Sequence, residues 1–220
     1  WLPDINITTD NPEPARTELV RRYLRSYGPA SPDDISWWTG LPPLHVQRVI
    51  TQLGREVLRY PIEGLSTELI GLRERVDTLR NLPEIKRSIQ FLPLWDAYTL
   101  GWRDRRRLVD EAMLPWIYDA AGNAVSVIVD EGRIIGLWQF RDSDRLTFEF
   151  HVFDNYRDRV PEVEKAAEKH AEVLAELSSA RSTQILEREL PQALSERGPG
   201  AFLWPLGKAP LYRNHKEDEV

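Results

Sequence analysis

Residues 87–110, RSIQFLPLWDAYTLGWRDRRRLVD, join a helix-rich first half of the chain to a strand-rich second half. The beginning of this stretch, residues 88–94, is apolar and loosely alternating, which predicts a strand. Pro93 marks the end or an edge of that strand, because proline cannot donate a hydrogen bond to a neighbouring strand. A loop is therefore expected to begin near Trp95.

This loop combines aromatic surface, carboxylates and four guanidinium groups. Such a mixture suits phosphate contact, because a guanidinium group can bind two phosphate oxygens at once. The alternative is that the carboxylates pair with the arginines and only fix the shape of the loop. Since neighbouring side chains on a strand or helix cannot all face one way, about two of the four arginines are expected to reach solvent. The candidate phosphate-binding residues are Arg103, Arg105, Arg106 and Arg107, and the candidate loop-organising residues are Asp96, Trp102 and Asp104.

With 220 residues the chain is long enough for two domains. It contains no cysteine, which excludes disulfides and thiolate metal sites, and its four histidines are scattered. Neither a metal nor a cofactor is expected. No apolar run approaches the roughly 20 residues that span a bilayer, so no membrane contact is expected. The polar start is not a signal peptide, and we expect a cytoplasmic protein. Because the sequence opens at Trp1 and not at methionine, we expect a chain that is either processed or numbered from an internal point of a longer protein.

The net charge of −6 argues at first against nucleic acid, but the two halves of the chain differ. Residues 1–107 carry 16 Lys and Arg against 14 Asp and Glu, whereas residues 108–220 carry 13 against 21. Nearly all the cations of the first half are arginines, which suit bidentate phosphate contact. The sequence therefore permits nucleic-acid binding by the first half.

The first half predicts three short helices. The first, over residues 13–27, has apolar side chains at helical spacing. The second follows Ser31, a good N-cap, and ends at Gly40. The third covers residues 44–53, and its periodicity predicts that Val46, Val49, Ile50 and Leu53 are buried while His45, Gln47, Arg48 and Gln52 face solvent.

Two strand-like segments, residues 57–62 and 66–72, follow with a predicted hairpin turn at residues 63–65. Three helices and a hairpin are typical of a winged helix, in which the third helix enters the DNA major groove and the hairpin touches the backbone or the minor groove. Small domains of this kind also serve as protein–protein modules. The expected partner is double-stranded DNA, and the candidate DNA-binding residues are His45, Gln47, Arg48 and Gln52 on the third helix and Arg59 on the hairpin.

The second half predicts a β-meander with a covering helix. Strands are expected at residues 124–129, 133–141 and 145–153, and the helix that covers them at residues 161–180. A linking helix at residues 73–82 and a helical segment at residues 108–113 precede them. The predicted fold class is α+β: a winged-helix domain over residues 13–82, a β-rich domain with its covering helix over residues 83–180, and a tail over residues 181–220.

The tail has two kinds of sequence. Its first part places Ile185, Leu186, Leu190 and Leu194 at helical spacing. Its charged end is expected to be disordered. The apolar residues of the tail could dock on the body of the protein or on a protein partner.

Three blocks of sequence resemble a known family. They are ARTELVRRYLRSYGPASPDDISWWTGL, LPLWDAYTLGWRDRRRLVD and VIVDEGRIIGLWQF, followed by an alternating strand and a covering helix. In this order they are similar to the winged-helix DNA-binding family that includes the AlkZ-like bacterial DNA glycosylases, which excise bulky alkylated bases and unhook interstrand cross-links. The resemblance covers roughly residues 13–178 and leaves out the tail.

The resemblance implies tandem winged-helix units ahead of a β-rich carboxy-terminal part. In that family the first unit carries a Gln-apolar-Gln or Gln-apolar-Asp catalytic motif. The motif is absent here, because Gln90-Phe91-Leu92 and Trp138-Gln139-Phe140 both fail its pattern. No catalytic residue is therefore assigned, and whether the chain is itself an enzyme is left open. The chain resembles the later portion of such a protein, or a family member without the first unit.

Three functions fit these observations. The first is the DNA-gripping part of a base-excision glycosylase that repairs alkylated or cross-linked DNA. The second is a non-catalytic winged-helix regulator that uses the same surface. The third is a protein-interaction module, which the acidic second half and the apolar tail favour.

Overall fold

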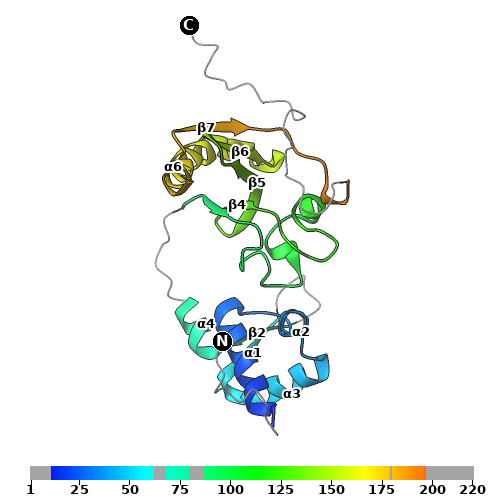
Figure 1. Cartoon of the computed structure of the whole chain (residues 1–220). Helices are drawn as coiled ribbons and strands as arrows, with labels where there is room; N and C mark the ends of the chain where they lie inside the picture. Colours follow the sequence, from blue (N-terminus) through cyan, green and yellow to red (C-terminus); the bar gives the residue numbers. More distant parts are fainter. Residues whose placement is uncertain (1–10, 62–67, 80–86, 179, 197–220) are drawn as a thin grey trace. The chain divides into compact units, whose positions relative to one another are not determined.

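The structure is a computed structural model that describes residues 11–61, 68–79, 87–178 and 180–196. It contains helices and sheets, so the predicted mixed α+β class is confirmed. The chain divides into two compact units, which are described separately (Figure 1). Unit 1 comprises Trp1–Ile85 together with Gly101–Asp104, and unit 2 comprises Lys86–Leu100 and Arg105–Val220.

Unit 1 contains three helices, an antiparallel pair of strands and a fourth helix. The predicted linking helix is present as far as residue 79, and its last predicted residues lie outside the described part. The elements are α1 (Glu13–Tyr27), α2 (Pro32–Thr39), α3 (Pro43–Leu53), the 3-10 turn η1 (Gly54–Glu56), β1 (Val57–Tyr60), β2 (Leu69–Leu72) and α4 (Arg73–Leu79).

The ends of α2 follow from its sequence. The Ser31 hydroxyl accepts a hydrogen bond from the Asp34 backbone N–H at 3.0 Å, and the Asp34 carboxylate accepts one from the Ser31 N–H at 3.0 Å. This capping box satisfies two donors that would otherwise lack a partner. Gly40 ends the helix with a φ of +70°, a conformation that glycine adopts without strain.

The phase of α3 is the predicted one. Its apolar side chains pack against α1 and α2 in the core of unit 1. The prediction for the buried face is confirmed for Val46, Val49, Ile50 and Leu53.

Strands β1 and β2 pair in register, with Val57 opposite Leu72 and Tyr60 opposite Leu69. Ala30, just before α2, adds a short antiparallel bridge to Ile70. This bridge ties the turn between α1 and α2 to β2. The predicted hairpin turn at residues 63–65 lies outside the described residues.

Unit 2 is built on a five-stranded sheet with the order β3-β4-β5-β6-β7. Neighbouring strands are antiparallel except β6 and β7, which are parallel. The elements are β3 (Gln90–Leu92), η2 (Arg105–Arg107), η3 (Glu111–Met113), α5 (Leu114–Ile117), β4 (Val127–Asp130), β5 (Arg133–Arg141), β6 (Arg145–Val152), η4 (Asp154–Arg159), α6 (Val160–Ser178), β7 (Ser182–Glu187) and η5 (Leu194–Glu196).

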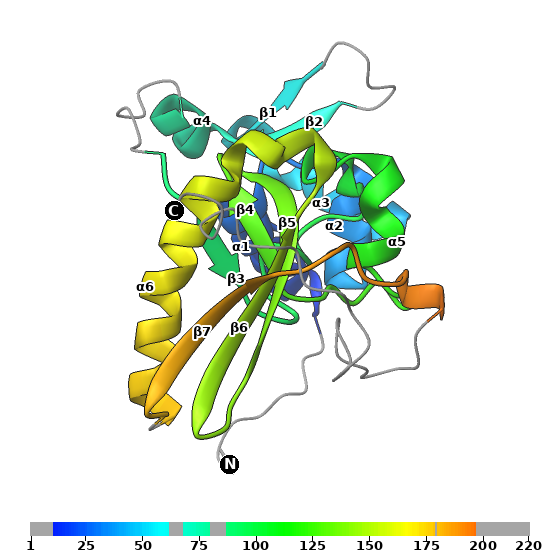
Figure 2. The same cartoon turned by 90° about the horizontal axis from the view of Figure 1, so that it is seen from above.

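Helix α6 covers one face of this sheet. Figure 2 shows it running alongside β6 and β7. The alternation of β6 points every second side chain toward the helix, which presents mainly small residues and so can approach the sheet closely. The buried residues of this core include Leu146, Phe148, Phe150 and Val152 from β6 and Val163, Ala167, Ala171 and Ala175 from α6.

The alternate residues of β6 include a fully buried charge. Glu149 is 0% exposed, and its carboxylate accepts hydrogen bonds from Gln139, Arg141 and Arg188. Arg188 follows β7 directly, and its backbone N–H donates to Phe150 O at 2.7 Å. A buried carboxylate needs such partners because desolvation would otherwise cost several kcal/mol. Glu149 thus joins β5, β6 and the end of β7.

Two expectations from helical spacing differ from the structure. Ile185 and Leu186 lie in β7 and not in a helix, because the free edge of β6 offers them a parallel partner. Leu190 lies outside the helices and strands, and Leu194 lies only in the short turn η5. In the segment over residues 108–113, only the last three residues form a 3-10 turn.

Candidate nucleic-acid interface

Helix α3 presents a continuous exposed stripe. Its exposed side chains recur every three or four residues, which places them on one face. Helix α3 contains no Asp or Glu, so nothing on this helix repels a phosphate. The stripe consists of Leu44, Gln47, Arg48, Thr51 and Gln52, and Arg55 in η1 continues it.

Arg48 is the central cation of the stripe. Its side chain is exposed, and within the described ranges it forms no ion pair or hydrogen bond. The neighbouring Gln52 is also exposed, and the Thr17 hydroxyl on α1 donates to its Oε1 at 3.1 Å. The stripe therefore offers the uncompensated guanidinium group of Arg48 beside an amide that α1 holds in place.

His45 departs from the prediction that it faces solvent. The side chain is only partly exposed, and its Nδ1 is buried without a hydrogen-bond partner among the described residues. The reason is its place on the helix, directly before the buried Val46 and at the border of the apolar face. The predicted exposure is confirmed for Gln47, Arg48 and Gln52.

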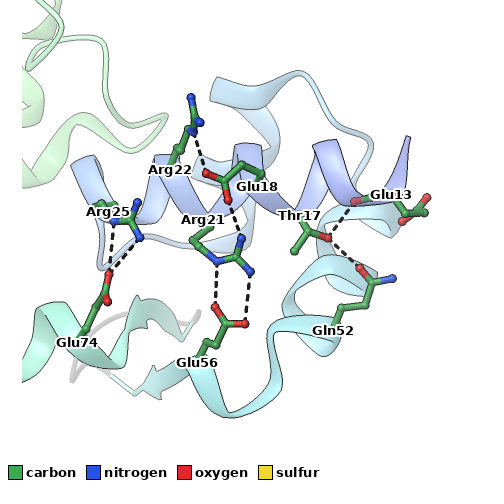
Figure 3. A network of polar contacts seen from close by, with 9 residues as sticks. All are labelled: Glu13, Thr17, Glu18, Arg21, Arg22, Arg25, Gln52, Glu56 and Glu74. Atoms are coloured by element: carbon green, nitrogen blue, oxygen red, sulfur yellow. Dashed lines mark hydrogen bonds and ion pairs between the residues drawn. The ribbon is translucent and has the colours of Figure 1, made fainter. Parts of the chain in front are cut away.

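Helix α1 contrasts with α3, because its arginines are paired with acids (Figure 3). Arg21 bonds Glu18 at 2.7 Å and Glu56 at 2.9 Å, and Arg22 bonds Glu18 at 2.9 Å. Hydrogen bonds from these two arginines lower the pKa of the Glu18 carboxyl below its ordinary value, and the bond from Arg22 has the larger effect. Arg25 pairs with Glu74 at 3.3 Å. This face of α1 is therefore balanced in charge.

Arg59, the hairpin candidate, has an acidic neighbour. Its Nη1 lies 3.4 Å from the Glu68 carboxylate, and both side chains are about half exposed. An exposed pair of this kind contributes at most about 1 kcal/mol, so a phosphate could replace Glu68 at little cost.

Unit 1 also includes the segment Gly101–Asp104, which carries Arg103. The Tyr23 hydroxyl donates to Gly101 O at 2.9 Å, and the Trp102 indole N–H donates to Tyr27 O at 2.9 Å. The rings of Trp102 and Tyr27 meet edge to face at 5.6 Å. Trp102 is buried, and these contacts hold the segment against α1.

Asp34 holds the next two residues of this segment. One carboxylate oxygen accepts the backbone N–H groups of Arg103 at 2.8 Å and Asp104 at 3.1 Å. The other oxygen belongs to the capping box of α2. Sequence reasoning missed the bonds from Asp34 to residues 103 and 104. The Ser-x-x-Asp spacing before an apolar run signals only the other role of Asp34, in the capping box.

The four arginines of the predicted cluster divide between the two units and between two environments. Arg103 belongs to unit 1, and Arg105, Arg106 and Arg107 belong to unit 2. Arg103 and Arg106 are exposed, whereas Arg105 and Arg107 are partly buried. This agrees with the expectation that about two of the four reach solvent.

Arg105 is an anchor inside unit 2. Its guanidinium group donates to Thr99 O and, at 3.5 Å, to Gly122 O, and it lies 4.4 Å from the centre of the Tyr118 ring. The Tyr118 hydroxyl also donates to Thr99 O, at 3.0 Å. Burial raises the pKa of Tyr118 to about 12. Arg105 therefore shapes the loop from inside.

Asp96 fixes the loop through the backbone. Its carboxylate accepts the Tyr98 N–H at 2.8 Å, and its carbonyl accepts the Thr99 hydroxyl at 2.7 Å. In the part of the chain that the structure describes, Asp96 forms no ion pair, so it holds the loop through its hydrogen bonds to Tyr98 and Thr99. The preceding Trp95 is 60% exposed and has a φ of +59°.

Among the residues with described positions, no group of three His, Cys, Asp or Glu side chains is placed to hold a metal ion. The described helices include none that is long and apolar enough to cross a membrane.

The chain belongs to the AlkZ-like DNA glycosylase family, whose model matches residues 1–177. The resemblance predicted from the three sequence blocks is thereby confirmed. An interstrand DNA cross-link repair glycosylase from Streptomyces sahachiroi is 27% identical over 161 residues, which are 71% of this chain and 42% of that protein. The solved structure of the S. sahachiroi DNA glycosylase AlkZ superposes with a TM-score of 0.65 at 25% identity, covering 82% of this chain and 47% of that one. The chain thus spans less than half the length of these relatives.

Proposed function

We propose that this chain is the DNA-binding portion of a DNA glycosylase that acts in the repair of alkylated or cross-linked DNA. In this proposal, unit 1 is a winged helix: α3 enters the major groove of double-stranded DNA, and the β1–β2 hairpin touches the backbone. Membership of the AlkZ-like family and the cross-link repair activity in the name of the Streptomyces relative support it.

The observation that carries the proposal is the contrast between α3 and α1. On α1 the cations are paired with glutamates, so an approaching phosphate would have to displace an acid. On α3 the central Arg48 has no acid on its own helix and no ion pair within the described residues. Phosphate contacts dominate the affinity of proteins for DNA, so an uncompensated cation on an exposed helix favours DNA binding.

The test compares Arg48→Ala with Arg22→Ala as the matched control. Arg22 is also an exposed helical arginine, 74% accessible, but it is paired with Glu18. Binding of a fluorescent duplex is measured across a salt series. Arg48→Ala should flatten the slope of log K against log salt by about 0.9, the value for one phosphate contact, whereas Arg22→Ala should leave the slope unchanged. Equal effects of the two changes would contradict the assignment of α3.

Catalysis is proposed to lie outside this chain, because the Gln-apolar-Gln or Gln-apolar-Asp motif is not in its sequence. The purified chain should therefore bind DNA that carries an alkylated purine without releasing the base. The measurement is base release, with a family member that contains the motif as the positive control. Robust release by residues 1–220 would refute this proposal and point to an unassigned catalytic residue.

The regulator remains the second candidate, because it would use the same α3 surface. Base release by the full-length protein separates the two. A glycosylase releases the base, and a regulator only binds.

A further inference from the structure

The segment Gly101–Asp104 is held by unit 1 at successive residues. Tyr23 bonds the carbonyl of Gly101, Trp102 bonds the carbonyl of Tyr27, and Asp34 bonds the N–H groups of the last two residues. A Cβ at Gly101 would lie 2.5 Å from the Tyr27 ring, so the close approach requires glycine. The backbone of this segment is therefore fixed against α1 and α2.

The side chain that emerges from this fixed backbone is that of Arg103. It is exposed, and no ion pair or hydrogen bond of its guanidinium group occurs among the residues the structure describes. Its backbone is thus rigid while its charge remains uncompensated. A cation on a rigid backbone loses less conformational freedom when it binds a phosphate, which favours binding.

We propose that Arg103 is a phosphate-contacting residue of unit 1 and that Asp34 is the residue that positions it. The inference rests on the proposed function, since it assumes that unit 1 binds DNA. It separates Arg103 from Arg105, whose guanidinium group bonds backbone carbonyls within unit 2. It also adds a second phosphate-contacting arginine to unit 1, besides Arg48 of the α3 stripe.

Asp34 suits this role because its carboxylate is almost fully buried and accepts hydrogen bonds from the backbone N–H groups of Ser31, Arg103 and Asp104. Hydrogen bonds from backbone N–H groups to a carboxylate are roughly twice as strong as those between neutral groups. Water does not compete for them, since the side chain of Asp34 is 1% exposed. A neutral residue at this position would loosen the backbone from which Arg103 projects.

The experiment is a double-mutant cycle on the full chain, with duplex binding measured across a salt series and thermal melting measured in parallel. Arg103→Ala should flatten the salt slope by about 0.9 without changing the melt. Asp34→Asn should flatten the slope by the same amount, and it should have no further effect on the slope when Arg103 is already alanine. A role of Asp34 in stability alone would instead leave the slope unchanged.

Ser31→Ala is the matched control, because it removes the other half of the capping box and leaves the bonds from Asp34 to residues 103 and 104 in place. It should lower the melting temperature and keep the slope. If Asp34→Asn does not fold, Trp102→Phe serves in its place, since it keeps an aromatic ring, although a smaller one, and loses the bond to Tyr27 O.

The outcomes separate this inference from the proposed function. A slope that falls with Arg48→Ala but not with Arg103→Ala would overturn the inference alone. Independent, additive losses from Asp34→Asn and Arg103→Ala would overturn the positioning role of Asp34. Absence of DNA binding by the unaltered chain would overturn the proposed function itself.

Discussion

Arg105 is the first residue of η2, and its guanidinium group contacts two backbone carbonyls and an aromatic ring. Hydrogen bonds from a charged donor are worth about 1.5–3 kcal/mol each when they are buried, and these are partly buried. We expect Arg105→Ala to lower the free energy of unfolding by about 2 kcal/mol, measured by urea denaturation. Arg48→Ala should change it by less than about 0.5 kcal/mol, as at other exposed sites. Equal stability of the two variants would show that Arg105 is not an anchor.

Tyr118 makes alkaline stability depend on one identifiable proton. Its pKa is raised by burial from 10.0 to about 12, so between these values the folded protein keeps a proton that the unfolded chain has lost. The stabilisation is fully present below about pH 10 and is lost as the pH rises toward 12. Tyr118→Phe should therefore show a shallower loss of unfolding free energy between about pH 9.5 and 11.5. Parallel curves for the two proteins would contradict the raised pKa.

Asp34 shows what could and could not be predicted at the scale of residues. Ser31 and Asp34 lie within one helical turn, and the start of the helix was read from such local spacing. The bond from Asp34 to Arg103 joins residues far apart in the sequence, and no local pattern encodes it. The sequence likewise places Asp96 and Arg105 in one loop. It does not show that Asp96 bonds the loop backbone or that the Arg105 guanidinium group bonds carbonyls of unit 2.

At the scale of elements, α3 and β7 show where hydrophobic periodicity predicts secondary structure correctly and where it does not. The four apolar residues of α3 fix its phase by themselves, because a helix satisfies its own hydrogen bonds. A strand depends on its neighbour, and Ile185 and Leu186 became strand residues only because β6 offered a free edge. Periodicity therefore predicted helix α3 correctly and wrongly predicted a helix where strand β7 lies.

The turn between β4 and β5 places a glutamate, Glu131, in a strained left-handed conformation that a substitution could relieve. Asp130 pairs with Arg133, and the two turn residues have positive φ values, +48° for Glu131 and +79° for Gly132. This turn favours Asn-Gly, since a left-handed conformation costs most other residues about 1 kcal/mol. Glu131→Asn should raise the free energy of unfolding by about 0.5–1 kcal/mol, measured by urea denaturation.

Glu131→Ala is the control for the hairpin, because it removes the same charge without gaining a residue suited to the turn. The pair between Glu131 and Arg87 at 3.3 Å is largely exposed and should contribute little. A gain as large for alanine as for asparagine would attribute the effect to charge rather than to backbone conformation.

At the scale of the whole molecule, the family match ends at residue 177 while the sheet continues to β7. A chain that ends at residue 180 loses the β6–β7 ladder and the bond from Arg188 to Glu149. The buried Glu149 carboxylate would then lose one of its cationic partners. Removing one partner of a buried ion pair typically lowers the free energy of unfolding by about 3–5 kcal/mol. We expect the amides of β6 to lose hydrogen-exchange protection in this chain. A chain ending at residue 192 retains both contacts and should keep the protection; equal protection would show that β7 is dispensable.

The order of strands in the sheet also sets the order in which it can assemble during synthesis. Strands β3 to β6 lie in the sheet as they follow in the chain, so each new strand finds its partner already made. The last pair differs, because Arg145 meets Ser182 only after the whole of α6 has been translated. At about 5–20 residues per second, β6 remains an open edge for a few seconds. An unpaired edge can pair with other chains, so we expect the nascent protein to be prone to association during this interval.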